Sequence, residues 1–397
     1  MTIITSLNRR RLLYLVGYLT LATGAGFISL NENKIWARLT WIVIIILAIR
    51  IVPKVEVPLK IKVYLLIFSA VIFASMVVND FPIHVTYIQR VLMIWLAASI
   101  PFYIKYENFM DSYVKFIRFI AFFSLICFAL TPLIRLLPFP MFSAGEGFYY
   151  KCLIFTNVSM LNNRNYGPFW EPGAFQLFLN WALLYEVRNP HKLYRKDVIL
   201  FSLTVLSTIS TAGIIIIALI LAYYYFNESK NKNIIREFGK RSFVIIVAVV
   251  GFVYLVSSSG INYFDKIEFM QENPEIKTSG NASTYTRYYS IFANLEAINR
   301  SPVFGVGVNG LKEEINDSYD LTSNTNSILS MPASFGVIAG FLYLYLIING
   351  SFKKGRSIMQ SAIFLIILLC IMSTENLIAS LIFWIFLFYE SNLKLYG

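Results

Sequence analysis

The sequence predicts an all-α polytopic membrane protein, on three observations. Apolar residues make up 57% of the 397 positions and charged residues only 14%, which does not suit a water-soluble surface. Hydrophobic runs of about the 20 residues needed to cross a bilayer recur along the chain. Lys and Arg gather in alternate connections between these runs, as expected when positive loops stay in the cytoplasm. We therefore expect one integral membrane domain, residues 1–397, with about 12 transmembrane helices.

The first predicted span runs from Leu12 to Leu30, directly after Arg9, Arg10 and Arg11. It is long for a signal peptide, and no clear small-residue cleavage site precedes the next run, so we expect a retained helix. The other predicted spans follow in chain order, at about residues 35–52, 61–78, 86–104, 113–137, 172–188, 197–211, 212–226, 242–259, 327–350, 357–372 and 376–390.

The positive charges predict that the N-terminus and the C-terminus are both cytoplasmic. Residues 197–226 decide this, because one long helix there would move the basic stretch from Lys230 to Arg241 to the outside. The polar, Gly-containing stretch Ser210–Gly213 favours a hairpin between two short spans. The net charge of +12 then lies mostly in cytoplasmic connections, so it gives no reason to expect a nucleic-acid partner.

Cysteine placement gives no support for a disulfide framework or a cysteine metal site. Of the three cysteines, Cys127 and Cys370 fall within predicted spans and Cys152 is external.

Two predicted external segments are longer than a simple connection, residues 138–171 and residues 259–325. The second lies between spans 9 and 10, and residues 283–299 have helical spacing with an apolar face that includes Tyr289 and Phe292. We expect this segment to be partly helical. On the same helix, Arg287, Ser290 and Asn294 form a polar line, which is either a solvated face or part of a binding site.

Arginines are unusually frequent at the predicted outer side, where the topology rule does not favour them. Within a span, arginine normally faces the protein interior, a water cavity or a partner, although one near the surface can extend to the headgroups. Together the arginines predict an electropositive site for the phosphate or diphosphate of an anionic lipid carrier. These arginines are Arg38, Arg90, Arg135, Arg164, Arg287 and Arg300.

Glu171 directly precedes a hydrophobic span whose first residue, Pro172, suits the first turn of a helix. Glu171 is therefore either a helix cap that interacts with the helix dipole or a general base toward a sugar hydroxyl. Gln176 and Asn180 continue one polar stripe along that helix, for substrate binding or for helix pairing.

Three stretches resemble the O-antigen polymerase and ligase superfamily of bacteria, Wzy-type polymerases in particular. The stretches are Arg164–Asn180 (RNYGPFWEPGAFQLFLN), Thr286–Asn309 (TRYYSIFANLEAINRSPVFGVGVN) and Asn324–Gly340 (NTNSILSMPASFGVIAG). Their order and external placement agree with the family layout. The family also repeats a glycine-containing backbone turn at Pro302–Gly307.

The resemblance implies a metal-independent glycosyltransferase without a cofactor, in the bacterial cytoplasmic (inner) membrane, with its active site on the periplasmic or extracytoplasmic face. The implied substrates are undecaprenyl-diphosphate-linked oligosaccharides, and the implied partners are membrane lipids, a chain-length regulator and a flippase. Arg164 and Arg287 match the family's arginine positions, and with Glu171 they form the expected catalytic set. The residues expected to bind the diphosphate or glycan are Arg38, Arg90, Arg135, Arg300, Asn294, Gln176 and Asn326.

One departure separates this chain from the ligases, which usually have His-Asn where Thr325-Asn326 stands here. The two histidines of the chain, His84 and His191, lie elsewhere. We therefore expect a polymerase acting in O-antigen, capsule or exopolysaccharide synthesis. Two alternatives stay open: a ligase that moves finished glycan onto a lipid or protein acceptor, and a polysaccharide transporter or flippase.

Overall fold

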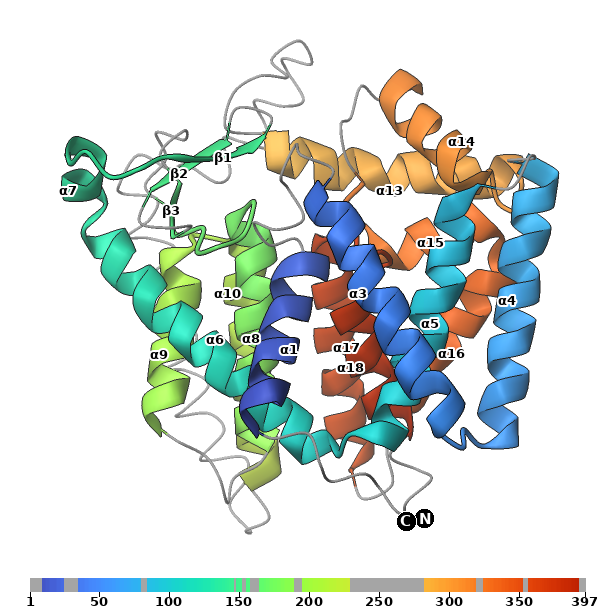
Figure 1. Cartoon of the computed structure of the whole chain (residues 1–397), viewed down its shortest axis with the longest axis horizontal. Coiled ribbons are helices and arrows are strands. Elements are labelled where there is room, and N and C mark those ends of the chain that lie inside the picture. The colour runs from blue at the N-terminus through green and yellow to red at the C-terminus, as the bar shows by residue number, and fades with distance from the viewer. Residues whose placement is uncertain are drawn as a thin grey trace.

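The computed structural model describes most of the chain and is predominantly helical (Figure 1). The described residues are 9–24, 35–79, 84–145, 148–151, 155–157, 164–188, 195–228, 282–318, 324–352 and 356–392. The predicted helical class is therefore confirmed. The count of 12 spans and the topology stay predictions, and the predicted span 242–259 lies outside the described residues.

The helices of the first half are α1 (Arg9–Thr23), α3 (Ile35–Ile51), α4 (Leu59–Asn79), α5 (Val85–Tyr103), α6 (Tyr106–Ala129), α7 (Thr131–Leu136), α8 (Pro172–Arg188), α9 (Arg195–Ser207) and α10 (Thr211–Glu228). Those of the second half are α13 (Ala282–Arg300), α14 (Gly307–Glu313), α15 (Ser327–Phe335), α16 (Val337–Ser351), α17 (Ile358–Thr374) and α18 (Leu381–Asn392). Short helical turns follow α3 (Val52–Lys54) and α14 (Glu314–Ser318).

A small antiparallel sheet, which the sequence did not predict, lies within the predicted external segment 138–171. Its strands are β1 (Phe142–Gly145), β2 (Phe148–Lys151) and β3 (Thr156–Asn157), in the order β1-β2-β3. Lys151 fixes this sheet to the end of α7, because its Nζ donates hydrogen bonds to the carbonyls of Arg135 (3.0 Å) and Leu137 (2.9 Å).

The surface of the bundle is that of a membrane protein. Three described helices, α4, α5 and α6, are long and apolar enough to cross a bilayer, and α10, α16, α17 and α18 are shorter apolar helices. Large apolar side chains remain exposed along the outer faces of α3, α4 and α6, among them Ile45, Ile49, Leu66, Phe73 and Phe122. A continuous apolar exterior of this kind suits contact with lipid rather than water.

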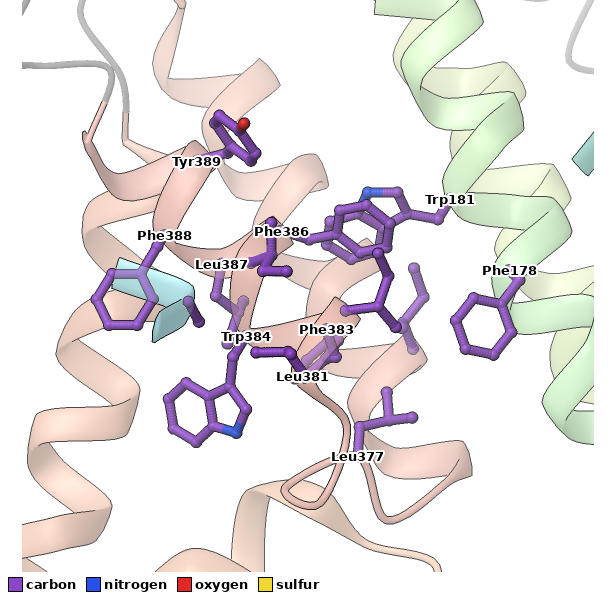
Figure 2. Close-up of a cluster of buried hydrophobic side chains, with 14 of the residues drawn as sticks. Phe178, Trp181, Leu377, Leu381, Phe383, Trp384, Phe386, Leu387, Phe388 and Tyr389 are labelled. Carbon is purple, nitrogen blue, oxygen red and sulfur yellow. The ribbon is translucent and has the colours of Figure 1, made fainter. Parts of the chain in front are cut away.

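The core is formed around two helices, α8 and α18, that are buried on all sides. Every residue of α8 from Pro172 to Val187 is buried, including the polar Gln176 and Asn180. Figure 2 shows aromatic side chains of α18 facing those of α8. The ring of Trp181 on α8 stacks on that of Phe386 on α18, with centroids 4.6 Å apart.

The predicted break between residues 197–211 and 212–226 is present but lies slightly earlier, since only Ser210 of the expected turn Ser210–Gly213 lies outside a helix. The chain turns between the end of α9 at Ser207 and the start of α10 at Thr211. Ser210 begins α10, since its carbonyl accepts from the Ile214 amide (3.0 Å) and its hydroxyl accepts from the Gly213 amide (3.4 Å).

The predicted continuous span 327–350 is wrong, because Gly336 breaks it into α15 and α16. Gly336 has φ +86°, and a Cβ there would lie 1.9 Å from the Val303 carbonyl oxygen. The segment 302–306 occupies the break: the Val337 amide donates to Pro302 O (2.8 Å), and the Val306 amide donates to Ala333 O (2.9 Å). The glycine turn expected in this segment is present, with positive φ at Gly305 and Gly307.

Helix ends that lie far apart in the sequence meet at one end of the bundle, around Glu390. Its carboxylate accepts from Arg188 at the end of α8 (2.5 Å), from Arg356 before α17 (3.2 Å) and from Tyr106 at the start of α6 (2.9 Å). We call these four residues the inner cluster, because the sequence predicts that this end faces the cytoplasm. At the opposite end, α13 lies across the bundle, roughly perpendicular to its helices (Figure 1).

Candidate active site

Three charged side chains from distant parts of the sequence meet where α13 crosses the bundle. Arg287 Nη2 lies 3.3 Å from Glu171 Oε1 and 3.7 Å from Glu375 Oε1. The arginine Nε donates to the carbonyl of Thr374 at 3.4 Å. We call Glu171, Arg287 and Glu375 the outer cluster. The side chains of Glu171 and Arg287 are 26% and 28% exposed, whereas that of Glu375 is 4% exposed.

The beginning of α8 positions Glu171. α8 begins at Pro172, as predicted, and the Glu171 carbonyl accepts from the Phe175 amide (3.2 Å), so Glu171 stands at the position before the first helical residue. Gly173 leaves room for the cluster. A Cβ at this position would lie 2.6 Å from both Arg287 Nη2 and Glu171 Oε1, and 3.1 Å from Glu375 Oε1. All three charged groups therefore approach the positive end of the α8 dipole.

A tightly held loop between α17 and α18 positions Glu375. The hydroxyl of Ser327, the first residue of α15, donates to the Glu375 carbonyl and accepts from the Leu377 amide (2.6 Å). On α5, Arg90 Nη1 donates to the Ile378 carbonyl (2.6 Å). These contacts fix the backbone of the loop, so the Glu375 carboxylate is held in a buried position.

The polar line on α13 faces the protein, which excludes the solvated-face alternative. Ser290 and Asn294 are fully buried. Asn294 and Asn324 exchange two amide hydrogen bonds of 3.1 and 3.0 Å, and Ser290 Oγ accepts from the Thr325 amide (3.3 Å). The aromatic side of α13 is instead the more exposed one, with Tyr288 57% and Phe292 43% exposed. α13 therefore binds the bundle through polar groups, and this contact places Arg287 over α8.

Burial raises the pKa of the Glu375 carboxyl well above its usual range, and the negative charge of Glu171 raises it further, against the lowering effect of Arg287. The pKa of the nearby Tyr166 phenol is also raised by burial, with Arg164 acting to lower it and Glu171 to raise it. The outer cluster is thus a site in which proton affinity depends on a few neighbouring charges.

Arg164 precedes Glu171 by seven residues, and two of its nitrogens donate to the backbone. Its Nε donates to Thr208 O (3.0 Å) and its Nη2 to Ile209 O (3.2 Å), where the chain leaves α9. Ile209 has a positive φ of 50°, so Arg164 stabilises an unusual turn. Its predicted contact with a diphosphate stays a prediction.

The other predicted arginines have separate surroundings. Arg90 is half-buried, its Nη1 donates to the Ile378 carbonyl, and its buried Nε has no hydrogen-bond partner among the described residues. Arg300 pairs with Glu314 at 2.6 Å. Arg38 is exposed on α3, and Arg135 lies on α7, the helix at the far left of Figure 1. Diphosphate binding by these four arginines stays a prediction.

The predicted glycan-binding amides are packed between helices. Asn326 caps α15, because its Oδ1 accepts from the amides of Ile328 and Leu329 at 3.0 Å each. Gln176 Oε1 accepts from Asn180 Nδ2 at 2.7 Å, and that Nδ2 also lies 3.4 Å from the Gly213 carbonyl on α10. These contacts favour the helix-pairing alternative for Gln176 and Asn180. Substrate binding by Gln176, Asn294 and Asn326 stays a prediction.

Sequence reasoning missed Glu375, the most deeply buried member of the outer cluster. The available signal was a single carboxylate in the short outer connection between two strongly apolar runs, 357–372 and 376–390. A carboxylate in such a place is costly unless it is paired or functional. No group of three His, Cys, Asp or Glu side chains suited to a metal occurs in the part of the chain that the structure describes.

The outer cluster combines a carboxylate that is accessible, a cation that can bind an anion and a second carboxylate held out of water. A carboxylate can take a proton from a hydroxyl, and a guanidinium can stabilise a phosphate leaving group. The arrangement therefore suits group transfer from an anionic carrier to a hydroxyl.

The helices and this cluster define the class: a membrane protein with a charged site at one end of a helix bundle. Residues 198–344 match a family model described as O-antigen ligase, which confirms the predicted resemblance to the O-antigen polymerase and ligase superfamily. The match supports a glycan-transferring enzyme of the ligase or polymerase kind, with lipid-linked glycan substrates. It includes Arg287 and Asn326, while Glu171 and Glu375 lie outside the matched residues. A comparison with curated proteins gives no match.

Proposed function

We propose that the chain is a polysaccharide polymerase of the Wzy type. It transfers an undecaprenyl-diphosphate-linked oligosaccharide onto another lipid-linked repeat unit at the outer face of the bacterial cytoplasmic membrane. The observation that carries the proposal is the contact of one arginine, Arg287, with Glu171 at the start of α8, where both side chains are partly exposed. A base and a phosphate-binding cation at this spacing are what glycosyl transfer from a diphosphate requires.

In the proposed reaction, Glu171 takes the proton of the acceptor hydroxyl. The acceptor oxygen forms a bond to the anomeric carbon of the donor glycan, and the bond from that carbon to the diphosphate oxygen breaks. Undecaprenyl diphosphate leaves with the bonding electron pair, and Arg287 stabilises its negative charge. Holding the two glycans in line supplies much of the rate, because a bound acceptor reacts as if it were highly concentrated.

The position of Arg287 supports a second effect of donor binding. Its Nη2 faces both carboxylates, so a diphosphate that binds this guanidinium competes with Glu171 for the same positive charge. Donor binding therefore releases Glu171 from this ion pair.

The surroundings of Thr325 favour a polymerase over a ligase. Thr325 stands where a ligase would usually have its histidine, it is buried, and its amide donates to Ser290 Oγ (3.3 Å). A threonine hydroxyl is a poor base at neutral pH. The family description names a ligase, so transfer of finished glycan to a lipid or protein acceptor remains the second candidate.

A transporter or flippase is a weaker alternative. Broken helices of transporters line a substrate path near the midplane, and the chain does have a break, at Gly336. Here, however, segment 302–306 packs into the break: its Val306 amide donates to the Ala333 carbonyl and its Pro302 carbonyl accepts from the Val337 amide, so these backbone groups are paired within the protein.

The decisive experiment supplies the purified protein in nanodiscs with its lipid-linked repeat unit and EDTA, and resolves the products by size. A ladder of products is expected from a metal-independent polymerase. In cells, a polymerase null strain should accumulate single lipid-linked repeats. Accumulation of long lipid-linked polymer would instead identify a ligase, and lipid-linked sugar trapped on the cytoplasmic side would identify a flippase.

A further inference from the structure

The charges of the outer cluster do not balance if both carboxylates are ionised. Two carboxylates, Glu171 and Glu375, face one guanidinium through the same nitrogen, at 3.3 and 3.7 Å. Two like charges that share a small, partly dehydrated site repel each other, and one proton held between them removes the repulsion.

The surroundings of Glu375 favour a proton on Glu375 rather than on Glu171. The charged groups that face it in the described structure are Arg287 from α13 and Glu171 before α8, while α15 contributes the uncharged Ser327. Its Oε1 is buried and has no hydrogen-bond partner among the described residues. The nearest cation, Arg287 Nη2, lies 3.7 Å from that oxygen, so burial there costs more for an ionised carboxylate than for a protonated carboxyl. Glu171 is 26% exposed and retains contact with water.

We propose that Glu375 is a positioning residue that carries the single proton of the Glu171–Glu375 pair and thereby keeps Glu171 as the one ionised carboxylate beside Arg287. The inference rests on the proposed function, since it concerns the base of that reaction. With Glu375 neutral, the outer cluster has no net charge. With Glu375 ionised, the cluster carries one negative charge, and an anionic diphosphate meets repulsion.

The sign of the pH dependence follows. Glu375 is neutral below its raised pKa, and the cluster then accepts the donor. As pH rises through that pKa, Glu375 ionises and binding of the anionic donor weakens. Ionisation of Glu375 therefore lowers the wild-type activity at alkaline pH. Glutamine at position 375 removes this effect, because its amide resembles a protonated carboxyl and does not titrate.

The activity test compares wild type, Glu375→Gln and Glu375→Ala in nanodiscs over a range of pH. Glu375→Ala is expected to lower turnover about a hundredfold, because Arg287 loses a neighbour that fixes it. Glu375→Gln is expected to recover most of that loss and to keep its activity on the alkaline side, where the wild type declines. An inactive Glu375→Gln, or one with an unchanged pH profile, would overturn the proposal.

A second readout does not depend on turnover. Infrared difference spectra over the same pH range should show a protonated carboxyl band in the wild type that Glu375→Gln lacks. The matched control is Glu313→Gln on α14, which should leave that band in place, because Glu313 is exposed and does not belong to the outer cluster. Presence of the band in Glu375→Gln would overturn the proposal even in an active enzyme. A wild type that shows the band but forms no glycan ladder would instead contradict the proposed function alone.

Discussion

The inner and outer clusters have opposite compositions, and α8 contributes to both. In the inner cluster one carboxylate, Glu390, serves two arginines and a tyrosine at 2.5 to 3.2 Å. In the outer cluster one arginine, Arg287, serves two carboxylates at 3.3 and 3.7 Å.

The inner cluster is closed, since Arg188 and Arg356 are 13% and 9% exposed and both also lie over the ring of Phe364. The outer cluster is open and its contacts are long. In the inner cluster the short contacts to several partners hold the helices together. In the outer cluster the longer contacts and the unequal number of positive and negative groups leave side chains available for a ligand.

The largest effect should come from breaking the inner cluster. Glu390→Gln removes the counter-ion that Arg188 and Arg356 share, and two buried positive charges are left together. We expect a loss of about 3–5 kcal/mol of stability, measured as a lower thermal midpoint and a lower yield of purified protein. Glu313→Gln, an exposed position on α14, is the control. An unchanged midpoint for Glu390→Gln would contradict a structural role.

The outer cluster should respond in the opposite way. Arg287→Ala is expected to lower polymer formation about a hundredfold or more, because the leaving diphosphate loses its cation, while the thermal midpoint changes little. Lys312→Ala provides an exposed basic control on α14. Normal chain length with Arg287→Ala at wild-type protein level would remove Arg287 from the proposed reaction.

A smaller effect is expected from Gly173→Ala. This substitution tests the geometry of the outer cluster without changing any charge. The added methyl of Gly173→Ala would lie 2.6 Å from Arg287 Nη2 and Glu171 Oε1. Displacement of these groups should cost about tenfold in turnover with little loss of stability. Gly310→Ala is the matched control. It adds the same methyl group, which would lie at an ordinary contact distance of 3.4 Å from Val306 Cβ. Equal turnover of the two variants would show that the spacing at α8 does not matter.

The smallest effect concerns Asn326. If capping of α15 is its role, Asn326→Ala should lower stability by about 1 kcal/mol, and Asn326→Asp, which keeps the cap, should restore it. Turnover per folded molecule should follow the same pattern, as measured beside the thermal midpoint. Loss of turnover in Asn326→Asp at full stability would instead favour the predicted contact with glycan.

Sequence patterns predicted features that depend on neighbouring residues. The start of α8 at Pro172 was correct, and the break between α9 and α10 was predicted at Ser210–Gly213 but lies slightly earlier, because proline, serine and glycine act locally. The break at Gly336 was missed, because its cause is the distant Val303 carbonyl. Glu375 was missed for the same reason, since only the fold brings it to Glu171 and Arg287.

α13 has a practical consequence for work with the purified protein. Its polar side is hydrogen-bonded to the bundle, and its aromatic side, with Tyr288 and Phe292, is exposed. Tyrosine and other aromatic rings prefer the membrane–water interface, so we expect this side to contact lipid headgroups. A detergent that strips away the surrounding lipid removes the medium that this side requires, and with it the support that holds Arg287 in place. We therefore expect micelles to understate what the enzyme does in a bilayer.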